Sequence, residues 1–185
     1  MLKVFCDKSA RPIVMYMKDV FKQLRGGGGL DGEQLTRYIG AYHAAVYRVA
    51  YSYLKNRADA EDVCQETFLR LYRFSGEFPS DDSCRAWLFR VAVNLSKNLL
   101  RSGWRTKRAE LTEDIPCESE EDLGLLESVM SLPPKYRVTI HLYYYEGYSV
   151  KEIADILGTT ATAVTTRLSR GREQLKKMLQ EEGLQ

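Results

Sequence analysis

Two stretches of the chain carry cations and hydrogen-bonding side chains at helical spacing, which is the chemistry needed to hold a phosphate backbone. In the first stretch, residues 84–101, one predicted helix face is made of Asn, Lys and Arg. Cations on one face suit a row of phosphates, while Asn amides can hydrogen-bond to base edges. The alternative is a solvated basic surface without a ligand. The candidate DNA-binding residues of this face are Arg90, Asn94, Lys97, Asn98 and Arg101.

The second stretch follows a strong helix-start signal. Ser149 and Glu152 form a capping box, which predicts a helix over 150–157. Gly158 can adopt the left-handed conformation that ends it, and Thr160 caps a second helix. This is the helix-turn-helix pattern, whose second helix enters the major groove of DNA. The alternative is an ordinary helical hairpin. The candidate DNA-binding residues are Thr160, Ala161, Thr162, Thr165, Thr166, Arg167 and Arg170.

The remaining reactive side chains are not arranged for catalysis. No carboxylates cluster as metal ligands, no nucleophile is paired with a base, and the glycines at 26–29 lack the Lys and Ser/Thr of a phosphate-binding loop. The four cysteines are widely scattered, and the spacing of a structural zinc site is absent (Cys6, Cys64, Cys84 and Cys117). We therefore expect reduced thiols in a cytoplasmic protein, with no catalytic residue, metal, cofactor or small-molecule substrate.

The charge distribution indicates how the chain is divided. Of 185 residues, 44% are hydrophobic, which is enough for a buried core, and no apolar run approaches the ~20 residues of a membrane span. The net charge of +2 divides into +4 for residues 1–29, +4 for 30–108, −7 for 109–122 and +1 for 123–185. We predict an all-α protein in which two small helical domains, 30–108 and 123–185, flank a flexible acidic linker.

Helical periodicity places three helices in the first domain. The first carries an apolar stripe from Leu35 to Tyr53 and ends at the polar residues 55–57. Asp59 is predicted to cap the second, which buries Ala60, Val63, Cys64, Thr67, Phe68 and Leu71. A loop over 75–83 leads into the third, which starts at Asp82 or Ser83. Its predicted buried stripe is Cys84, Trp87, Leu88, Val91, Leu95 and Leu99.

Residues 1–29 allow three explanations. Ser9 and Pro12 could start a short helix that ends before the four glycines at 26–29. Alternatively, residues 1–29 are upstream sequence. A purine-rich ribosome-binding sequence read in frame would encode such Arg and Gly repeats, and Leu30 would then be the true start. The third explanation is an engineered linker.

Three segments, in this order, resemble the extracytoplasmic-function (ECF) sigma factors of the sigma-70 superfamily. Residues 56–72 (NRADAEDVCQETFLRLY) resemble the polymerase-binding helix of the sigma-2 domain. Residues 87–95 (WLFRVAVNL) resemble the helix that reads the promoter element nearest the start site. Residues 132–137 (LPPKYR) and 145–149 (YEGYS), followed by the helix-turn-helix, resemble the sigma-4 domain. The match covers about residues 35–180.

The resemblance implies a sigma factor that binds core RNA polymerase and directs promoter-specific initiation. It implies that the loop 75–83 holds a base flipped from the non-template strand at the minus-ten element, beside the face of Asn94. The sigma-4 helix-turn-helix would read the minus-thirty-five element, and the acidic linker would thread toward the RNA exit path. The residues that would dock on the clamp helices of the polymerase are Asp62, Gln65, Glu66, Leu69 and Arg70.

The resemblance also implies an anti-sigma partner, often membrane-anchored. The sequence departs from the family at Thr165 and Gly171, where a basic residue and Ala are common; Gly171 weakens its helix by roughly 1 kcal/mol and could mark a bend. Two other functions compete with this one. A free-standing repressor or activator would use the helix-turn-helix alone and leave the first domain unexplained, and a nucleic-acid enzyme would need the catalytic cluster that the sequence lacks.

Overall fold

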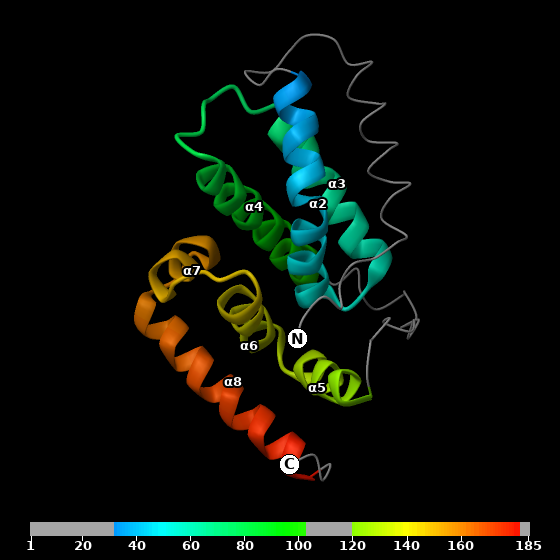
Figure 1. The fold of residues 1–185 in the computed structure, drawn as a ribbon, viewed down its shortest axis with the longest axis vertical. Helices are drawn as coiled ribbons and strands as arrows, with labels where there is room; N and C mark the ends of the chain where they lie inside the picture. Colours follow the sequence, from blue (N-terminus) through cyan, green and yellow to red (C-terminus); the bar gives the residue numbers. More distant parts are fainter. Residues whose placement is uncertain (1–31, 103–119, 182–185) are drawn as a thin grey trace.

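The computed structural model describes residues 32–102 and 120–181, which fold as helices with no strand in those ranges. The first body consists of α2 (Gly32–Leu54), α3 (Arg57–Tyr72) and α4 (Asp81–Arg101). The second consists of α5 (Glu120–Ser131), α6 (Pro134–Ile140), the π-helical η2 (His141–Tyr145), α7 (Val150–Leu157) and α8 (Ala161–Glu181) (Figure 1). The predicted all-α, two-domain fold is confirmed. The expectations for residues 1–29 fall outside the described ranges, as do Cys6, Cys117 and most of the acidic segment.

The first body is held by the apolar faces of its three helices. The predicted stripe of α2 is buried, apart from a half-buried Tyr42, and the predicted inner face of α3 is buried throughout. The chain reverses after α2 at Lys55, whose φ is 53°. The cap of α3 differs from our expectation: the side chain of Asn56, not of Asp59, accepts from the Asp59 N–H at 3.0 Å. Asp59 instead lies buried in the first turn.

The buried face of α4 also differs from the predicted stripe. The helix begins at Asp81, with Ser80 accepting from the Ser83 N–H at 3.1 Å. Trp87, Val91, Leu95 and Leu99, which we expected to be buried, are only half-buried. The difference arises because α7 of the second body packs against α4 and covers a further face of this helix. The fully buried positions are Cys84, Leu88, Phe89, Ala92, Val93 and Ser96.

The second body contains the predicted helix-turn-helix. The Glu152 N–H donates to Ser149 Oγ at 3.4 Å, and the Ser149 N–H donates to Glu152 Oε2 at 2.9 Å, so the capping box is complete. Gly158 adopts the left-handed conformation (φ 61°, ψ 53°). Thr160 Oγ1 then accepts from the Ala163 N–H at 3.1 Å and caps α8. Both boundaries of α7 match the prediction.

Two features of this body were not anticipated. The first helix, α5, begins at Glu120, so residues 120–122 of the acidic segment are helical; acidic side chains stabilise the positive end of a helix dipole. Gly171 is buried where α8 meets α6, and a Cβ there would lie 2.7 Å from Ile140 Cδ1. Gly171 therefore allows close packing of α8 on α6, a role that we did not expect.

The two bodies are in contact. In Figure 1, α7 lies against α4 and α6 lies beside the end of α2, and both pairs make direct contacts. Across the first of these contacts, the ring centroids of Phe89 and Tyr148 are 5.7 Å apart. No helix in the described ranges is long and apolar enough to cross a membrane.

Candidate nucleic-acid interface

The polar face predicted on α4 is largely open. Arg90, Asn94, Asn98 and Arg101 are all exposed. Within the described ranges, neither Arg90 nor Arg101 forms an ion pair with a carboxylate. An exposed row of cations flanked by amides is suited to phosphates and base edges.

Lys97 differs from its neighbours on this face. It is half-buried, and its Nζ donates to the backbone oxygen of Leu157, the last residue of α7, at 2.6 Å. Burial lowers the pKa of Lys97, and the nearby charges of Arg167 and Arg101 add to that effect. Lys97 therefore contacts the second body, whereas the other four residues face solvent.

The start of α8 presents small side chains with a defined hydrogen-bonding state. Thr165 Oγ1 donates to the oxygen of Ala161 at 3.1 Å, and Thr166 Oγ1 donates to that of Thr162 at 2.9 Å. Because these hydroxyl protons serve the helix itself, their lone pairs remain available to accept. Thr160, Ala161, Thr162, Thr165, Thr166 and Arg170 are exposed, and Arg167 is half-buried.

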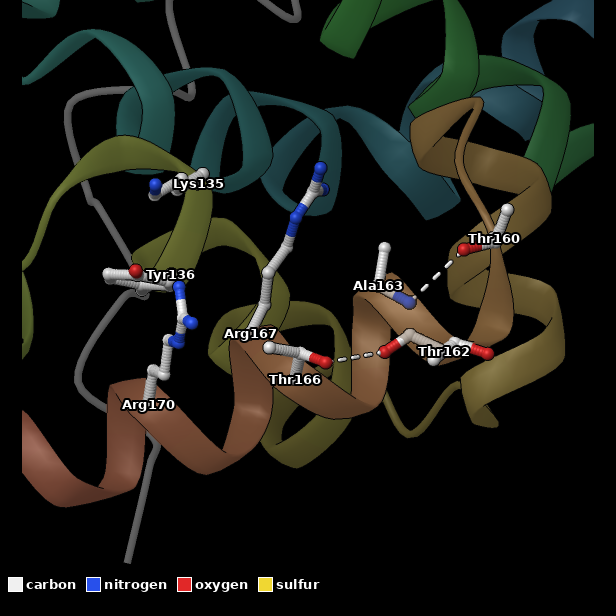
Figure 2. Close-up of a pocket in the computed structure, with 8 residues that line it drawn as sticks. All are labelled: Lys135, Tyr136, Thr160, Thr162, Ala163, Thr166, Arg167 and Arg170. Carbon is white, nitrogen blue, oxygen red and sulfur yellow. Dashed lines mark hydrogen bonds between the residues drawn. The ribbon is translucent and has the colours of Figure 1, made fainter.

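A groove of about 430 Å³ lies between the start of α8 and the start of α6 (Figure 2). Its lining includes Arg167 and Arg170, together with two residues that we did not predict as site residues, Lys135 and Tyr136. A hydrogen bond from Arg170 lowers the pKa of Tyr136. The sequence contained one signal for Lys135 and Tyr136. Pro134 just before them is typical of the first position of a helix, which places both residues in its first turn. Only the packing of α6 on α8 turns them toward the recognition helix.

The loop between α3 and α4 is anchored by aromatic side chains. The ring of Phe74 stacks on Phe78 at 4.7 Å and lies 5.2 Å from Trp87. A Cβ on Gly76 would lie 2.7 Å from Phe74 Cζ, so the loop passes closely over this ring. The far end of the loop is tied by Arg37, which donates to both carboxylate oxygens of Asp81 at 2.7 and 3.0 Å. That hydrogen bond lowers the pKa of Asp81.

The outer face of α3 is acidic and has its own internal pairing. Arg70 Nε donates to Glu66 Oε1 at 2.9 Å, one helical turn apart. Asp62 and Gln65 are exposed, and Leu69 is half-buried among them. A shallow groove of about 440 Å³ joins Asp62 and Glu66 to Leu95, Asn98 and Leu99 of α4. This face combines polar side chains with the half-buried Leu69, and the adjoining groove adds Val63, Leu95 and Leu99, a mixture that suits a protein-binding surface.

The described residues hold no group of three His, Cys, Asp or Glu side chains that could bind a metal ion. Cys64 and Cys84 are free and buried. Burial raises the pKa of both thiols, to about 12 for Cys84. Such thiols are poor nucleophiles near neutral pH.

Comparison with known proteins agrees with the two-domain helical fold. The sigma-70 region 2 family matches residues 38–106, and the sigma-70 region 4 family matches residues 123–175. The ECF RNA polymerase sigma factor SigW of Bacillus subtilis is 29% identical over 187 residues, covering 90% of this chain and 98% of SigW. The RNA polymerase sigma factor NccH of Alcaligenes xylosoxydans is 33% identical over 153 residues, covering 74% of this chain and 81% of NccH.

A solved structure has the same fold. The sigma factor RpoE of Bartonella quintana, crystallised with the anti-sigma factor NepR, superposes with a TM-score of 0.65 at 22% identity, covering 78% of this chain and 95% of that one. The chain belongs to the ECF group of the sigma-70 family. It is a sigma factor, which binds core RNA polymerase and directs it to promoters.

Proposed function

We propose that the exposed face of α4 reads the minus-ten element and that the start of α8 reads the minus-thirty-five element. The observation that carries this assignment is the row of exposed side chains on α4. Arg90 and Arg101 would hold phosphates, while Asn94 and Asn98 would hydrogen-bond to bases of the melted strand. Lys97 would join them once it leaves Leu157.

The start of α8 is suited to duplex DNA. The methyl groups of Ala161, Thr162 and Thr165 can contact thymine methyls, and the hydroxyl lone pairs of Thr165 and Thr166 can accept from base amino groups. The three cations of the neighbouring groove would hold the phosphates on either side. Lys135, from α6, thereby becomes an additional candidate contact.

The loop 75–83 is proposed to receive the flipped base of the minus-ten element. Extracting a base from the stack costs free energy, so the pocket that receives it must already be formed. The stacking of Phe74, Phe78 and Trp87 and the ion pair of Asp81 would hold the loop in one shape before DNA arrives.

The outer face of α3 is proposed to dock on the clamp helices of the polymerase. Glu66 and Arg70 pair along the helix, which lowers the cost of burying these two side chains, and Leu69 supplies an apolar centre. The residues of this contact are Asp62, Gln65, Glu66, Leu69 and Arg70.

We further propose the organisation and setting of the chain. Residues 30–108 and 123–185 would be the sigma-2 and sigma-4 domains, 109–122 a linker threading toward the RNA exit path, and 1–29 an extension. The protein would act in the cytoplasm as an initiation factor without enzymatic activity. Because the related RpoE was crystallised with an anti-sigma factor, we also propose an anti-sigma factor as a partner of this chain. Such partners are often anchored in the membrane.

Sequencing of the DNA bound by reconstituted holoenzyme tests the assignment of the two surfaces. We expect two conserved elements in the selected DNA. Asn94→Ala should relax selection in the downstream element only, and Thr162→Ala in the upstream element only. Selection of one palindromic site by the isolated chain would instead support a free-standing repressor.

A further inference from the structure

We propose that Tyr136 and Tyr144 are positioning residues, which hold Arg170 and Arg172 on the two sides of α8 so that these arginines bind the phosphates that border the minus-thirty-five element. We call Arg170 and Arg172 the arginine pair. The inference rests on the proposed function of α8 and extends its surface beyond the side chains that contact bases.

The arginine pair leaves α8 on opposite sides. Successive residues of an α-helix are about 100° apart around the axis, so residues two positions apart diverge by about 200°. Both arginines are exposed, whereas Gly171 between them is buried, and a Cβ on Gly171 would lie 2.7 Å from Ile140 Cδ1. The continuous helix of α6 and η2 therefore passes beneath α8 at this point, and the two arginines can reach different parts of it.

On one side, Arg172 is held by a tyrosine of η2. Its Nε donates to the Tyr144 hydroxyl at 2.7 Å, and its guanidinium carbon lies 5.4 Å from the centroid of the same ring. The guanidinium carbon is also 5.7 Å from the ring centroid of Tyr143, which meets Tyr144 edge to face. A guanidinium carries five N–H donors, and the bond to Tyr144 uses one of them. Since Tyr144 is 55% exposed, the contact lies at the surface, within reach of a ligand.

An unusual turn presents these two rings. Residues 141–145 form a π-helix, in which the Glu146 N–H donates to the His141 oxygen at 3.1 Å. A π-helical turn contains more residues than an α-helical one, so neighbouring side chains are closer together around the axis, and Tyr143 and Tyr144 both reach Arg172. π-Helical turns are rare and frequently occur at functional sites.

On the other side, Arg170 is held by a tyrosine of α6. Its side chain extends toward Tyr136 in Figure 2 and donates a hydrogen bond to the Tyr136 side chain. Lys135 Nζ lies 4.9 Å from the centroid of the same ring. Among the described residues, no Asp or Glu lines the groove that these three side chains share. Both arginines are thus oriented by a tyrosine.

A tyrosine is a partner that orients an arginine without neutralising it. A carboxylate would hold the guanidinium equally well but would cancel its charge, whereas a phenol is uncharged near neutral pH. Within the described ranges, neither arginine of the pair forms an ion pair with a carboxylate. An arginine that is already oriented loses less side-chain entropy when it binds a phosphate, so its contact is stronger.

The spacing of the two tyrosines fits the major groove. Tyr136 and Tyr144 are eight residues apart, which corresponds to about 12 Å along a helix axis. The major groove of B-DNA is also about 12 Å wide, and a row of phosphates follows each of its edges. With Thr165 and Thr166 facing the bases, the arginine pair would lie beside the two opposite rows.

Neutral linkages in promoter DNA test the arginine pair. Single methylphosphonates, each of which removes the charge of one phosphate, are placed in turn along both strands of the upstream element of a promoter that the holoenzyme selects. We expect one sensitive position on each strand, where binding of the wild-type holoenzyme falls about tenfold. Arg172→Gln should abolish the sensitivity at one of these positions, and Arg170→Gln at the other.

Tyrosine-to-phenylalanine variants test the positioning role, because they remove the hydroxyl and keep the ring. Tyr144→Phe should weaken promoter binding about threefold and reduce the sensitivity at the phosphate assigned to Arg172. It should have no further effect in an Arg172→Gln background. Tyr136→Phe should act in the same way on the phosphate assigned to Arg170.

Tyr145→Phe is the matched control. Tyr145 follows Tyr144 in the same π-helix but stacks on His141, with ring centroids 5.0 Å apart. This variant should keep both sensitive phosphates and the wild-type affinity for the promoter. All variants should bind core polymerase as the wild type does, which shows that they are folded.

Two results would overturn the arginine pair: a wild-type holoenzyme with no sensitive phosphate on either strand, and tyrosine variants that match the Tyr145→Phe control. Thr162→Ala separates this failure from failure of the proposed function. If Thr162→Ala relaxes selection in the upstream element while the neutral linkages have no effect, only the arginine pair is wrong. If neither change affects that element, the assignment of α8 is wrong as well.

Discussion

The outer faces of α3 and α4 belong to neighbouring helices of one domain, yet they treat their charges in opposite ways. On α3, Glu66 and Arg70 form an ion pair along the helix, and Leu69 lies beside them. On α4, Arg90 and Arg101 have no ion pair within the described ranges. This contrast indicates what each face can bind, because paired charges suit a protein surface and unpaired cations suit phosphate.

The largest effect should come from placing a charge at the centre of the α3 face. We expect Leu69→Asp to weaken binding to core polymerase by about 3 kcal/mol, roughly 100-fold, since the new carboxylate would be buried without a partner. Titration of labelled protein with core polymerase measures this loss. Ala58→Asp adds the same charge at an exposed position outside the face and should bind normally.

The next effect should come from α4 and leave polymerase binding intact. Asn94→Ala should reduce open-complex formation about tenfold through the loss of one base contact. Asn94→Asp, which adds a negative charge beside the phosphates, should reduce it further. Permanganate footprinting of holoenzyme on a cognate promoter reports both variants. If Asn94→Ala and Leu69→Asp lose polymerase binding equally, the two faces have been assigned wrongly.

A smaller effect should appear in the salt dependence of promoter binding. Removing two phosphate contacts with Arg90→Gln/Arg101→Gln should reduce the slope of log K against log salt by about 1 to 2. Filter binding of holoenzyme between low and moderate KCl measures the slope. Arg57→Gln removes a cation that is already paired with Glu61, so a drop in slope per charge as large as that of the double variant would contradict the comparison.

The smallest effect should be a loss of stability at low pH, which affects both faces equally because it arises in the core beneath them. Burial lowers the pKa of His43, which stacks on Phe68 of α3 at 6.1 Å. In the unfolded chain the imidazole takes up a proton near pH 6.5, whereas in the folded protein it does so only at lower pH. The contribution of neutral His43 to the free energy of unfolding is therefore complete above pH 6.5 and decreases as the pH falls. We expect a loss of about 1 kcal/mol between pH 7.5 and 5.5.

Urea unfolding at the two pH values measures this loss. His43→Gln should reduce the difference between them, whatever its effect on absolute stability. Burial also lowers the pKa of His141, against the opposing effect of Glu146, and the remaining pH dependence is assigned to that residue. A pH dependence unchanged by His43→Gln would exclude His43 as its source.

The sequence predicted best what is encoded locally. The limits of α7 follow from Ser149, Glu152 and Gly158, which lie within ten residues of one another, and the stripes of α2 and α3 follow from helical periodicity. The cap of α3 was misassigned between two residues of the same capping class, Asn56 and Asp59.

The sequence could not predict what depends on distant contacts. Phe89 is buried partly through Tyr148, and Lys97 is drawn to Leu157, which lies 60 residues further along the chain. Lys135 joins the groove of α8 only because α6 packs there. The types of side chain in the candidate site could therefore be predicted from the sequence. Which of them contact the other domain depends on the packing of the two domains.

Run-off transcription from a promoter selected by the holoenzyme shows directly whether this chain initiates transcription only together with core polymerase. We expect transcripts of defined length only when this chain and core polymerase are both present, together with weak binding of the isolated chain to the same DNA. Tight, sequence-specific binding by the isolated chain, without any stimulation of core polymerase, would contradict it.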